Sequence, residues 1–245
     1  MLNKYIGIRP GNLGCHLPDS KPYADKYPLL SIPSQAKPIA LGINWYSDFD
    51  SPVLKDGEYW IGLNPKSLGY IRGGHAIPIK PQFSGPGVSL KDRLALHLYY
   101  DQGDTGHCVG FSYSRIASWF NYYRFSGDYL YYEAKKIDGE PGAENGSSMD
   151  SGARALSKNH EQVTGVYPIS NVQSPNPKWR IASYRWAQSV DEIKVVLNSP
   201  NHEDHNAVPL FNSWGKWYPQ YVWLPYETLD RLLKENGDAC VPTDA

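Results

Sequence analysis

Stretches typical of helices and stretches typical of strands are segregated along this chain, and their order constrains the fold more than any other feature. Apolar runs rich in β-branched and aromatic residues, typical of strands, lie toward both ends. Runs with helical spacing fill the middle. This order predicts an α+β fold with a helical lobe and an antiparallel β lobe. The predicted strands cover 38–47, 57–64, 73–80 and 207–215, and the predicted helices cover 108–123, 128–137, 145–159, 189–199 and 225–237.

The chain length and composition predict one domain. A chain of 245 residues is long enough to bury a sizeable core. Residues 1–37 are rich in Pro, Gly and Ser and predict an extended N-terminal arm. We expect residues 38–80 and 205–224 to form the β lobe, and residues 100–200 to be mainly helical. The Pro- and Gly-rich run 80–89 would link the two lobes.

Charge and cysteine content exclude several classes of protein. The formal net charge is −1 and no run of basic residues exceeds two, so we expect no nucleic-acid partner. The three cysteines, Cys15, Cys108 and Cys240, are far apart and form no CxxC pair, which argues against a disulfide framework and a structural zinc site. The sequence has no secretory h-region and no apolar run long enough to cross a bilayer, so we expect a cytoplasmic protein with no membrane partner.

The segment "DQGDTGHCVGF" (101–111) places a single cysteine where an amphipathic helix is predicted to begin. A thiolate at Cys108 would face the positive end of the helix dipole, which lowers the pKa of a cysteine thiol. Gly103 and Gly106 would let a substrate approach the backbone closely. The amide of Gln102 and the backbone N–H of Cys108 together would form an oxyanion hole. The competing interpretations are a surface glutamine and a packed structural cysteine, and Cys108 taken alone favours the latter.

Two further segments supply a base and a residue to orient it. His75 follows two glycines in "GGHA" and opens a short apolar run, although an edge-strand histidine would look the same. Asn212, in "NSWG", would bind one imidazole nitrogen and fix the tautomer, with Trp214 shielding that hydrogen bond from water. His205 is a rival base. It precedes Asn212 by seven residues on one predicted strand, roughly 20 Å away, so we favour His75.

These three segments resemble the signature blocks of papain-like cysteine peptidases, with the greatest similarity to divergent bacterial and bacteriophage members. The segments "NGSSMDSGARAL" (145–156) and "GVYPIS" (165–170) resemble one wall of the family's cleft and its Tyr-Pro segment. The resemblance implies a papain-like two-lobe fold. It also implies catalytic roles for Cys108, His75, Asn212 and Gln102, and substrate contacts from Gly106, His107, Gly146, Ser147 and Trp214.

The sequence departs from the family pattern in two respects. Val109 and Thr105 stand where the family usually has an aromatic residue and a second cysteine. More importantly, His75 precedes Cys108, whereas in the family the histidine follows the cysteine. A triad is defined by geometry and not by chain order, so strands from the N-terminal part could take the same positions in the sheet. This hypothesis requires strands 38–47 and 73–80 to share a sheet with 207–212.

The resemblance implies hydrolysis of peptide or isopeptide bonds in a peptide or protein substrate, without a cofactor or metal. The "HEDH" segment (202–205) is a weak metal motif and is more typical of a solvated loop. Two alternatives remain open. One is a catalytically silent papain-like module with a structural or binding role, in a bacteriophage particle for example, which would place it in the virion. The other is an acyltransferase, because the first half-reaction is shared. Cys240 is expected to be a packed thiol.

Overall fold

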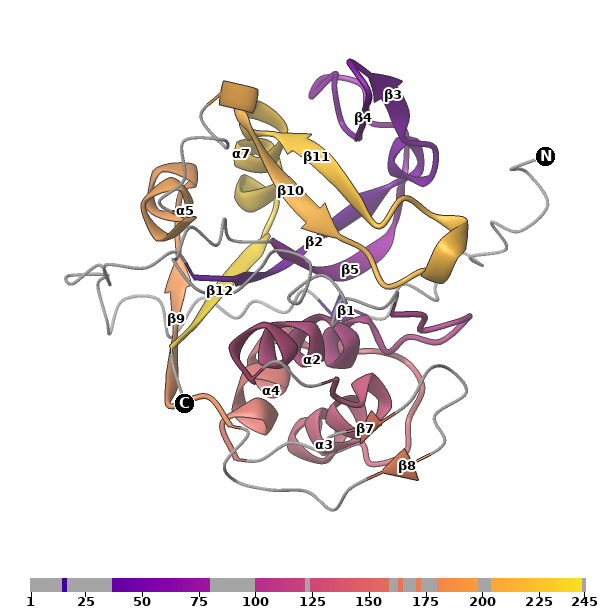
Figure 1. The fold of residues 1–245 in the computed structure, drawn as a ribbon, viewed down its shortest axis with the longest axis vertical. Coiled ribbons are helices and arrows are strands. Elements are labelled where there is room, and N and C mark those ends of the chain that lie inside the picture. The colour runs from indigo at the N-terminus through magenta and orange to yellow at the C-terminus, as the bar shows by residue number, and fades with distance from the viewer. Residues whose placement is uncertain are drawn as a thin grey trace.

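Helices flank the main sheet in the computed structural model (Figure 1). The helices α2, α3 and α4 lie below the sheet, whereas α5 and α7 lie beside its upper part. The helices are α2 (Cys108–Asn121), α3 (Gly127–Asp138), α4 (Met149–Leu156), α5 (Val190–Leu197) and α7 (Tyr226–Lys234), with short 3-10 turns at Ser47–Asp50 and Gly215–Trp217. The structure describes residues 15–16, 37–79, 100–121, 124–158, 163–164, 171–172, 180–197 and 204–243.

A largely antiparallel sheet connects segments far apart in the sequence. Its main path runs in the order β3-β4-β11-β10-β5-β2-β12-β9, and only the β4–β11 pairing on this path is parallel. The short β1 pairs with β5 and with β6, whereas β7 and β8 form a separate hairpin. The strands are β1 (Cys15–His16), β2 (Ile39–Tyr46), β3 (Val53–Lys55), β4 (Glu58–Trp60), β5 (Ile71–Ile79), β6 (Ser147–Ser148), β7 (Val163–Thr164), β8 (Asn171–Val172), β9 (Ser183–Ala187), β10 (Ala207–Phe211), β11 (Tyr221–Pro225) and β12 (Asp238–Thr243).

In the centre of this sheet, β5 pairs with both β2 and β10. The strand β2 pairs antiparallel with β5 from Ile39↔Ile79 to Tyr46↔Ile71. On its other side, β5 pairs antiparallel with β10 at Leu210↔Ile79. The predicted strands 38–47 and 73–80 therefore share a sheet with 207–211. This pairing brings the segment that carries His75 beside the segment that leads to Asn212.

Small residues let α2 pack closely against the middle of the sheet. Ala40 of β2 and Ala76 of β5 are buried in the same apolar cluster as Cys108 and Val109 of α2. Larger side chains on the opposite face, including Trp45 of β2, form a second cluster with α5 and α7. The sheet is thus covered on both faces, as burial of its apolar strands requires.

The predicted helices are confirmed, with shifted ends. The helix α2 begins at Cys108 as predicted. The helix α4 begins only at Met149, because Ser147 and Ser148 form β6 and the Ser148 hydroxyl caps the helix by accepting from Ser151 N–H. Ser189 caps α5 by accepting from Glu192 N–H, although the Glu192 carboxylate binds Gln188 N–H and not Ser189 N–H as a capping box predicts. No helix in the described ranges has the length and apolar character needed to cross a bilayer.

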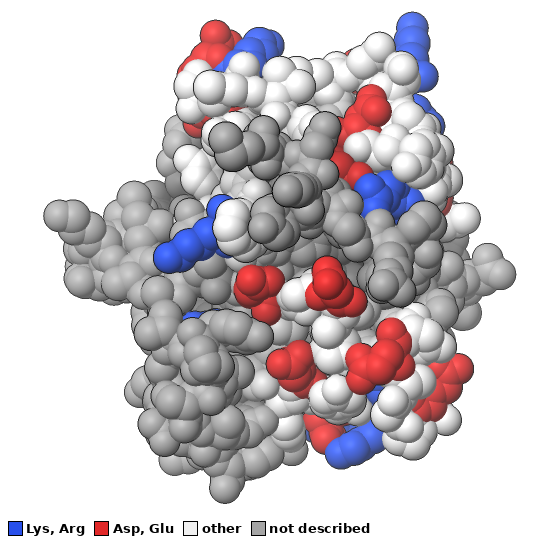
Figure 2. All heavy atoms as spheres, turned by 90° about the vertical axis from the view of Figure 1, so that its right-hand side faces the viewer, with Lys and Arg blue, Asp and Glu red and all other residues white. Residues whose placement is uncertain are grey.

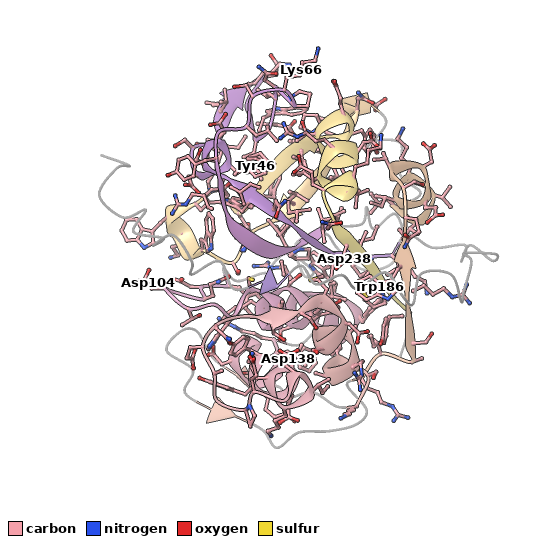
Figure 3. The ribbon with its side chains drawn as sticks, turned by 180° about the vertical axis from the view of Figure 1, so that it is seen from behind. Tyr46, Lys66, Asp104, Asp138, Trp186 and Asp238 are labelled. Atoms are coloured by element: carbon pink, nitrogen blue, oxygen red, sulfur yellow. The ribbon has the colours of Figure 1, made fainter. Side chains whose placement is uncertain are left out.

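Six strands of the sheet were not predicted, namely β1, β3, β6, β9, β11 and β12, and the predicted strand 57–64 is shortened to β4. The strand β12 lies between β2 and β9, where Asp238 pairs with Gly42 and Cys240 with Ala40 (Figure 3). A stretch of only six residues that includes a proline gives too little alternation to be identified as a strand. Cys240 is buried within this strand, as expected for a packed thiol.

We predict that Gly110→Ala destabilises the protein by about 3 kcal/mol, because α2 and α3 cross at this residue. A Cβ at Gly110 would collide with the carbonyl oxygen of Gly127 and lie 2.7 Å from the backbone nitrogen of Tyr131. Backbone atoms cannot rotate away as a side chain can. Urea denaturation measures the effect, with Lys136→Ala on the exposed side of α3 as the control. A Gly110→Ala variant as stable as the control would contradict this account of the crossing.

Candidate functional site

The centre of the candidate site is a hydrogen bond between His75 on β5 and Asn212, which directly follows β10. His75 Nε2 lies 3.1 Å from Asn212 Oδ1. The same oxygen accepts from Ser213 N–H at 2.8 Å, which orients the amide with its oxygen toward the ring. His75 must then carry its proton on Nε2, which leaves the lone pair on Nδ1. Neither His75 Nδ1 nor Asn212 Nδ2 has a hydrogen-bond partner in the part of the chain that the structure describes.

Aromatic rings enclose this histidine. The ring of Trp45 lies edge-on at 4.8 Å between centroids, and that of Trp214 lies at 5.1 Å. The imidazole is fully buried, and this burial lowers the pKa of His75 to about 4, against the opposing effect of the Asn212 hydrogen bond. The ring is therefore neutral at pH 7, and its Nδ1 can accept a proton. Trp214 contacts the His75 ring, as does Trp45, which precedes His75 by thirty residues and was missed by sequence reasoning.

Cys108 is the first residue of α2, the helix that packs against β5. The cysteine is fully buried, in the same apolar cluster as Ala76, the residue after His75. The carbonyl oxygen of His107 accepts from Phe111 N–H at 3.1 Å, so the first turn of the helix starts at the residue before Cys108. At this position a sulfur atom lies near the backbone N–H groups at the positive end of the helix dipole.

Backbone pairing joins the turn before Cys108 to the turn that carries Asn212. Gln102 N–H donates to Ser213 O at 2.8 Å, and Asp101 forms an isolated β-bridge with Trp214. The Gln102 side chain is buried. Its Oε1 accepts from the Ser213 hydroxyl, and its Nε2 donates to Thr105 O at 2.9 Å. A carboxamide nitrogen has two hydrogens, so a second N–H of Gln102 remains for another acceptor.

A buried arginine, which sequence reasoning missed, also contacts this region. Arg115 lies seven residues after Cys108, two turns along the same side of α2. Its guanidinium lies over the rings of Tyr100 and Phe211, at 4.8 and 5.4 Å from their centroids, and its Nη2 donates to Asn212 O at 3.5 Å. Burial lowers the pKa of Arg115 to about 10, so the group stays charged at pH 7. A charged residue at a core-facing helical position was the available signal in the sequence.

The predicted wall residues are held by α3. Gly146 N–H donates to the hydroxyl of Tyr131 at 3.1 Å, and the Ser147 hydroxyl donates to Asp138 at 2.7 Å. In Figure 3, Asp138 lies among the helices and Asp104 lies on the loop that leads into α2. We call residues 143–148 the wall segment.

The short strand β1 lies between the wall segment and β5. Cys15 pairs antiparallel with Gly74, the residue before His75. On its other side, Cys15 pairs in parallel register with Ser147, and His16 pairs with Ser148. Part of the predicted N-terminal arm therefore forms β-bridges to both segments that flank the candidate site. Figure 1 shows β1 next to β5. The rest of the arm and the linker 80–89 lie outside the described residues.

His107 has a different environment from the one expected of a residue lining a cleft. Its ring is buried between two carboxylates, with Nδ1 2.7 Å from Asp128 Oδ1 and Nε2 2.6 Å from Glu144 Oε2. Both nitrogens are thus engaged within the protein. Gly106 is buried as well.

The rival histidine lies at the other end of β10. His205 Nε2 binds Glu58 Oε2 at 2.8 Å, and its ring stacks on Trp223 at 4.0 Å. The structure therefore places His75, and not His205, against Asn212. His202 lies outside the described residues, and within the described ranges no group of three or more His, Cys, Asp or Glu side chains is placed to hold a metal ion.

Comparisons with known proteins find similarity to solved structures. No protein-family model matches the chain, and no curated protein matches it. A crystal structure of xylellain, a cysteine protease from Xylella fastidiosa, is similar at 15% sequence identity and a TM-score of 0.46, over 68% of this chain and 95% of that chain. Similarity at this level does not assign a function, which is argued below from the geometry of the chain itself.

We predict that His75 makes the stability of the protein depend on pH in the acid range. The pKa of His75 is lowered from its ordinary value of 6.5 to about 4, so between these values the unfolded chain binds more protons than the folded one. The contribution of His75 to the free energy of unfolding is fully present above pH 6.5 and is lost as the pH falls toward 4. From pH 7 to pH 5 the loss due to His75 is about 2 kcal/mol.

Urea denaturation of the wild type and of His75→Gln at both pH values measures this contribution. Between pH 7 and pH 5, the free energy of unfolding should fall by about 2 kcal/mol less in His75→Gln than in the wild type. His205→Gln serves as the control for removal of a histidine outside the site. Equal losses in the wild type and in His75→Gln would contradict the burial of a neutral ring.

Proposed function

We propose that this chain is a thiol hydrolase that cleaves peptide or isopeptide bonds, with Cys108 as nucleophile and His75 as general base. The observation that carries the proposal is the neutral, buried imidazole. Asn212 holds its Nε2–H, and its Nδ1 lone pair has no hydrogen-bond partner among the described residues. The strand that bears this ring packs against the helix that Cys108 begins. A base, an orienting amide and a thiol at a helix N-terminus are the parts that thiol catalysis requires.

The reaction takes place in two half-reactions. The Cys108 sulfur gives its proton to His75 Nδ1 and attacks the substrate carbonyl carbon, forming a tetrahedral oxyanion. The backbone N–H of Cys108 and the second amide N–H of Gln102 donate to that oxygen. The C–N bond then breaks, His75 returns the proton to the leaving amine, and a thioester remains on Cys108. His75 next removes a proton from water, whose oxygen attacks the thioester and releases a carboxylic acid and the thiol.

Asn212 and the surrounding aromatic rings support this role for His75. The Asn212 oxygen selects the tautomer that has its lone pair on Nδ1, and it stabilises the imidazolium once the proton has transferred. Trp45 and Trp214 keep water from this hydrogen bond, which strengthens it. Arg115 restrains Asn212 through the carbonyl oxygen of that residue.

The pairing of β1 supports an extended polypeptide as substrate. A segment of this chain already forms β-bridges to Gly74 on one side and to Ser147 on the other. An extended peptide can use the same backbone groups, as in other complexes formed by strand addition. On this proposal, the helices and the sheet correspond to the two lobes of a papain-like fold, with the histidine strand supplied from before the nucleophile.

We predict that Cys108→Ala abolishes hydrolysis of a mixture of fluorogenic peptides, and that Asn212→Ala lowers kcat/KM by about 10²-fold because the imidazole loses its orientation. Cys240→Ala is the matched control and should retain full activity. Hydrolysis that survives Cys108→Ala would reject the proposed nucleophile. Adding an amine acceptor to the assay distinguishes a hydrolase from an acyltransferase. Only an acyltransferase would convert the thioester chiefly to an amide.

We predict that iodoacetamide alkylates Cys108 faster than Cys240, since on this proposal His75 takes the proton of the Cys108 thiol, whereas burial raises the pKa of the Cys240 thiol. His75→Gln should slow the alkylation of Cys108 by about tenfold and leave that of Cys240 unchanged. Mass spectrometry of digested protein reads both rates. Slow and equal labelling of both cysteines, together with no hydrolysis, would favour a catalytically silent module.

A further inference from the structure

The residue before the proposed nucleophile connects three separate segments of the protein. His107 Nδ1 lies 2.7 Å from Asp128 Oδ1 in the first turn of α3, and Nε2 lies 2.6 Å from Glu144 Oε2 in the wall segment. The imidazole stacks on Tyr131 at 3.8 Å between centroids, and Tyr132 lies edge-on to it at 5.4 Å. The His107 side chain is 4% exposed, whereas its carboxylate partners are about half exposed.

Both contacts can be hydrogen bonds to carboxylates only if both ring nitrogens carry hydrogen. A neutral imidazole has one N–H, whereas an imidazolium has two and can donate to both acceptors. The described groups that face the ring are Asp128, Tyr131 and Tyr132 from α3 and Glu144 from the wall segment. Although partial burial opposes it, the contact with His107 lowers the pKa of Glu144. Acidic side chains gather on the lower half of one face of the molecule (Figure 2), where the helices lie in Figure 1.

A second set of contacts continues from the ring to the wall segment. The hydroxyl of Tyr131 donates to Ala143 O at 2.8 Å and accepts from Gly146 N–H at 3.1 Å. The hydroxyl of Tyr132 donates to Glu144 Oε1 at 2.9 Å. The wall segment is therefore joined to the start of α2 directly, through Glu144, and indirectly, through the tyrosine that stacks on His107.

We propose that His107 is a positioning residue that fixes the wall segment relative to Cys108 and thereby sets the affinity for substrate. This inference rests on the proposed function, because the wall segment would bind the backbone of the substrate. His107 does not contact the reacting atoms. Its Glu144 contact controls the distance between the wall and the start of α2, and its Asp128 contact holds the ring against α3. Loosening the wall costs binding energy for an extended peptide but leaves the thiol and its base in place.

Two isosteric substitutions separate the contacts of His107. The amide nitrogen of asparagine can take the place of Nδ1, so His107→Asn keeps the Asp128 contact and loses the Glu144 contact. The amide nitrogen of glutamine can take the place of Nε2, so His107→Gln keeps the Glu144 contact. Glu144→Ala removes the wall contact from the other side. Glu133→Ala, which removes an exposed ion pair with Lys136 on α3, is the matched control.

We expect His107→Asn and Glu144→Ala to raise KM about fivefold with kcat within about twofold of the wild type, because only substrate positioning is lost. His107→Gln and Glu133→Ala should keep the wild-type KM. Thermal melting of each variant checks that it is folded. Unchanged KM in folded His107→Asn and Glu144→Ala, or the same KM for His107→Asn and His107→Gln, would overturn the positioning role.

Amide hydrogen exchange tests the same connection without turnover. Peptides covering residues 143–148 should exchange several-fold faster in His107→Asn and Glu144→Ala than in the wild type, and at the wild-type rate in the other two variants. If the wild type shows no Cys108-dependent hydrolysis, the proposed function fails. The exchange measurement still decides whether His107 holds the wall segment in place. Equal exchange in all five proteins would show that His107 does not hold the wall segment.

Discussion

Antiparallel pairing of β5 with β2 and with β10 is the constraint on which the candidate site depends. It carries His75 and Asn212, which are 137 residues apart in sequence, to within 3.1 Å of each other. The register of β2 against β5 is continuous from Ile39 to Trp45 and shifts only between Trp45 and Tyr46. A slip of one residue would turn His75 to the other face of the sheet, away from Asn212.

Once formed, the site is held by groups that are costly to leave without partners. A buried neutral histidine, two carboxamides and a guanidinium lie among large aromatic rings. Each polar group in such surroundings must hydrogen-bond or destabilise the fold. Asn212 satisfies several of these requirements at once. Its side-chain oxygen binds His75 and Ser213 N–H, and its backbone oxygen accepts from Arg115. Within this site, His75 Nδ1, Asn212 Nδ2 and Arg115 Nη1 have no hydrogen-bond partner among the described residues, and two of these atoms lie in the proposed triad.

The site was more predictable from the sequence than the sheet. Residues with distinctive chemistry stand in short segments, and two of the proposed partners, His75 and Asn212, proved to be in contact. The long strands β2 and β5 were evident from their apolar runs, whereas β12 gave too weak a pattern to be recognised as a strand. Contacts such as those of Trp45 with His75, and of His107 with Asp128 and Glu144, arise only when distant segments pack together. No local pattern marks them.

The position of β12 has a consequence for how the protein is made. This strand, Asp238–Thr243, is the last described element, yet it lies between β2, among the first, and β9. Until β12 has been synthesised, one edge of β2 is open and β9 has no neighbour among the described strands. The helices can form earlier from local contacts, but closure of the sheet requires β12, which is synthesised after every other described element.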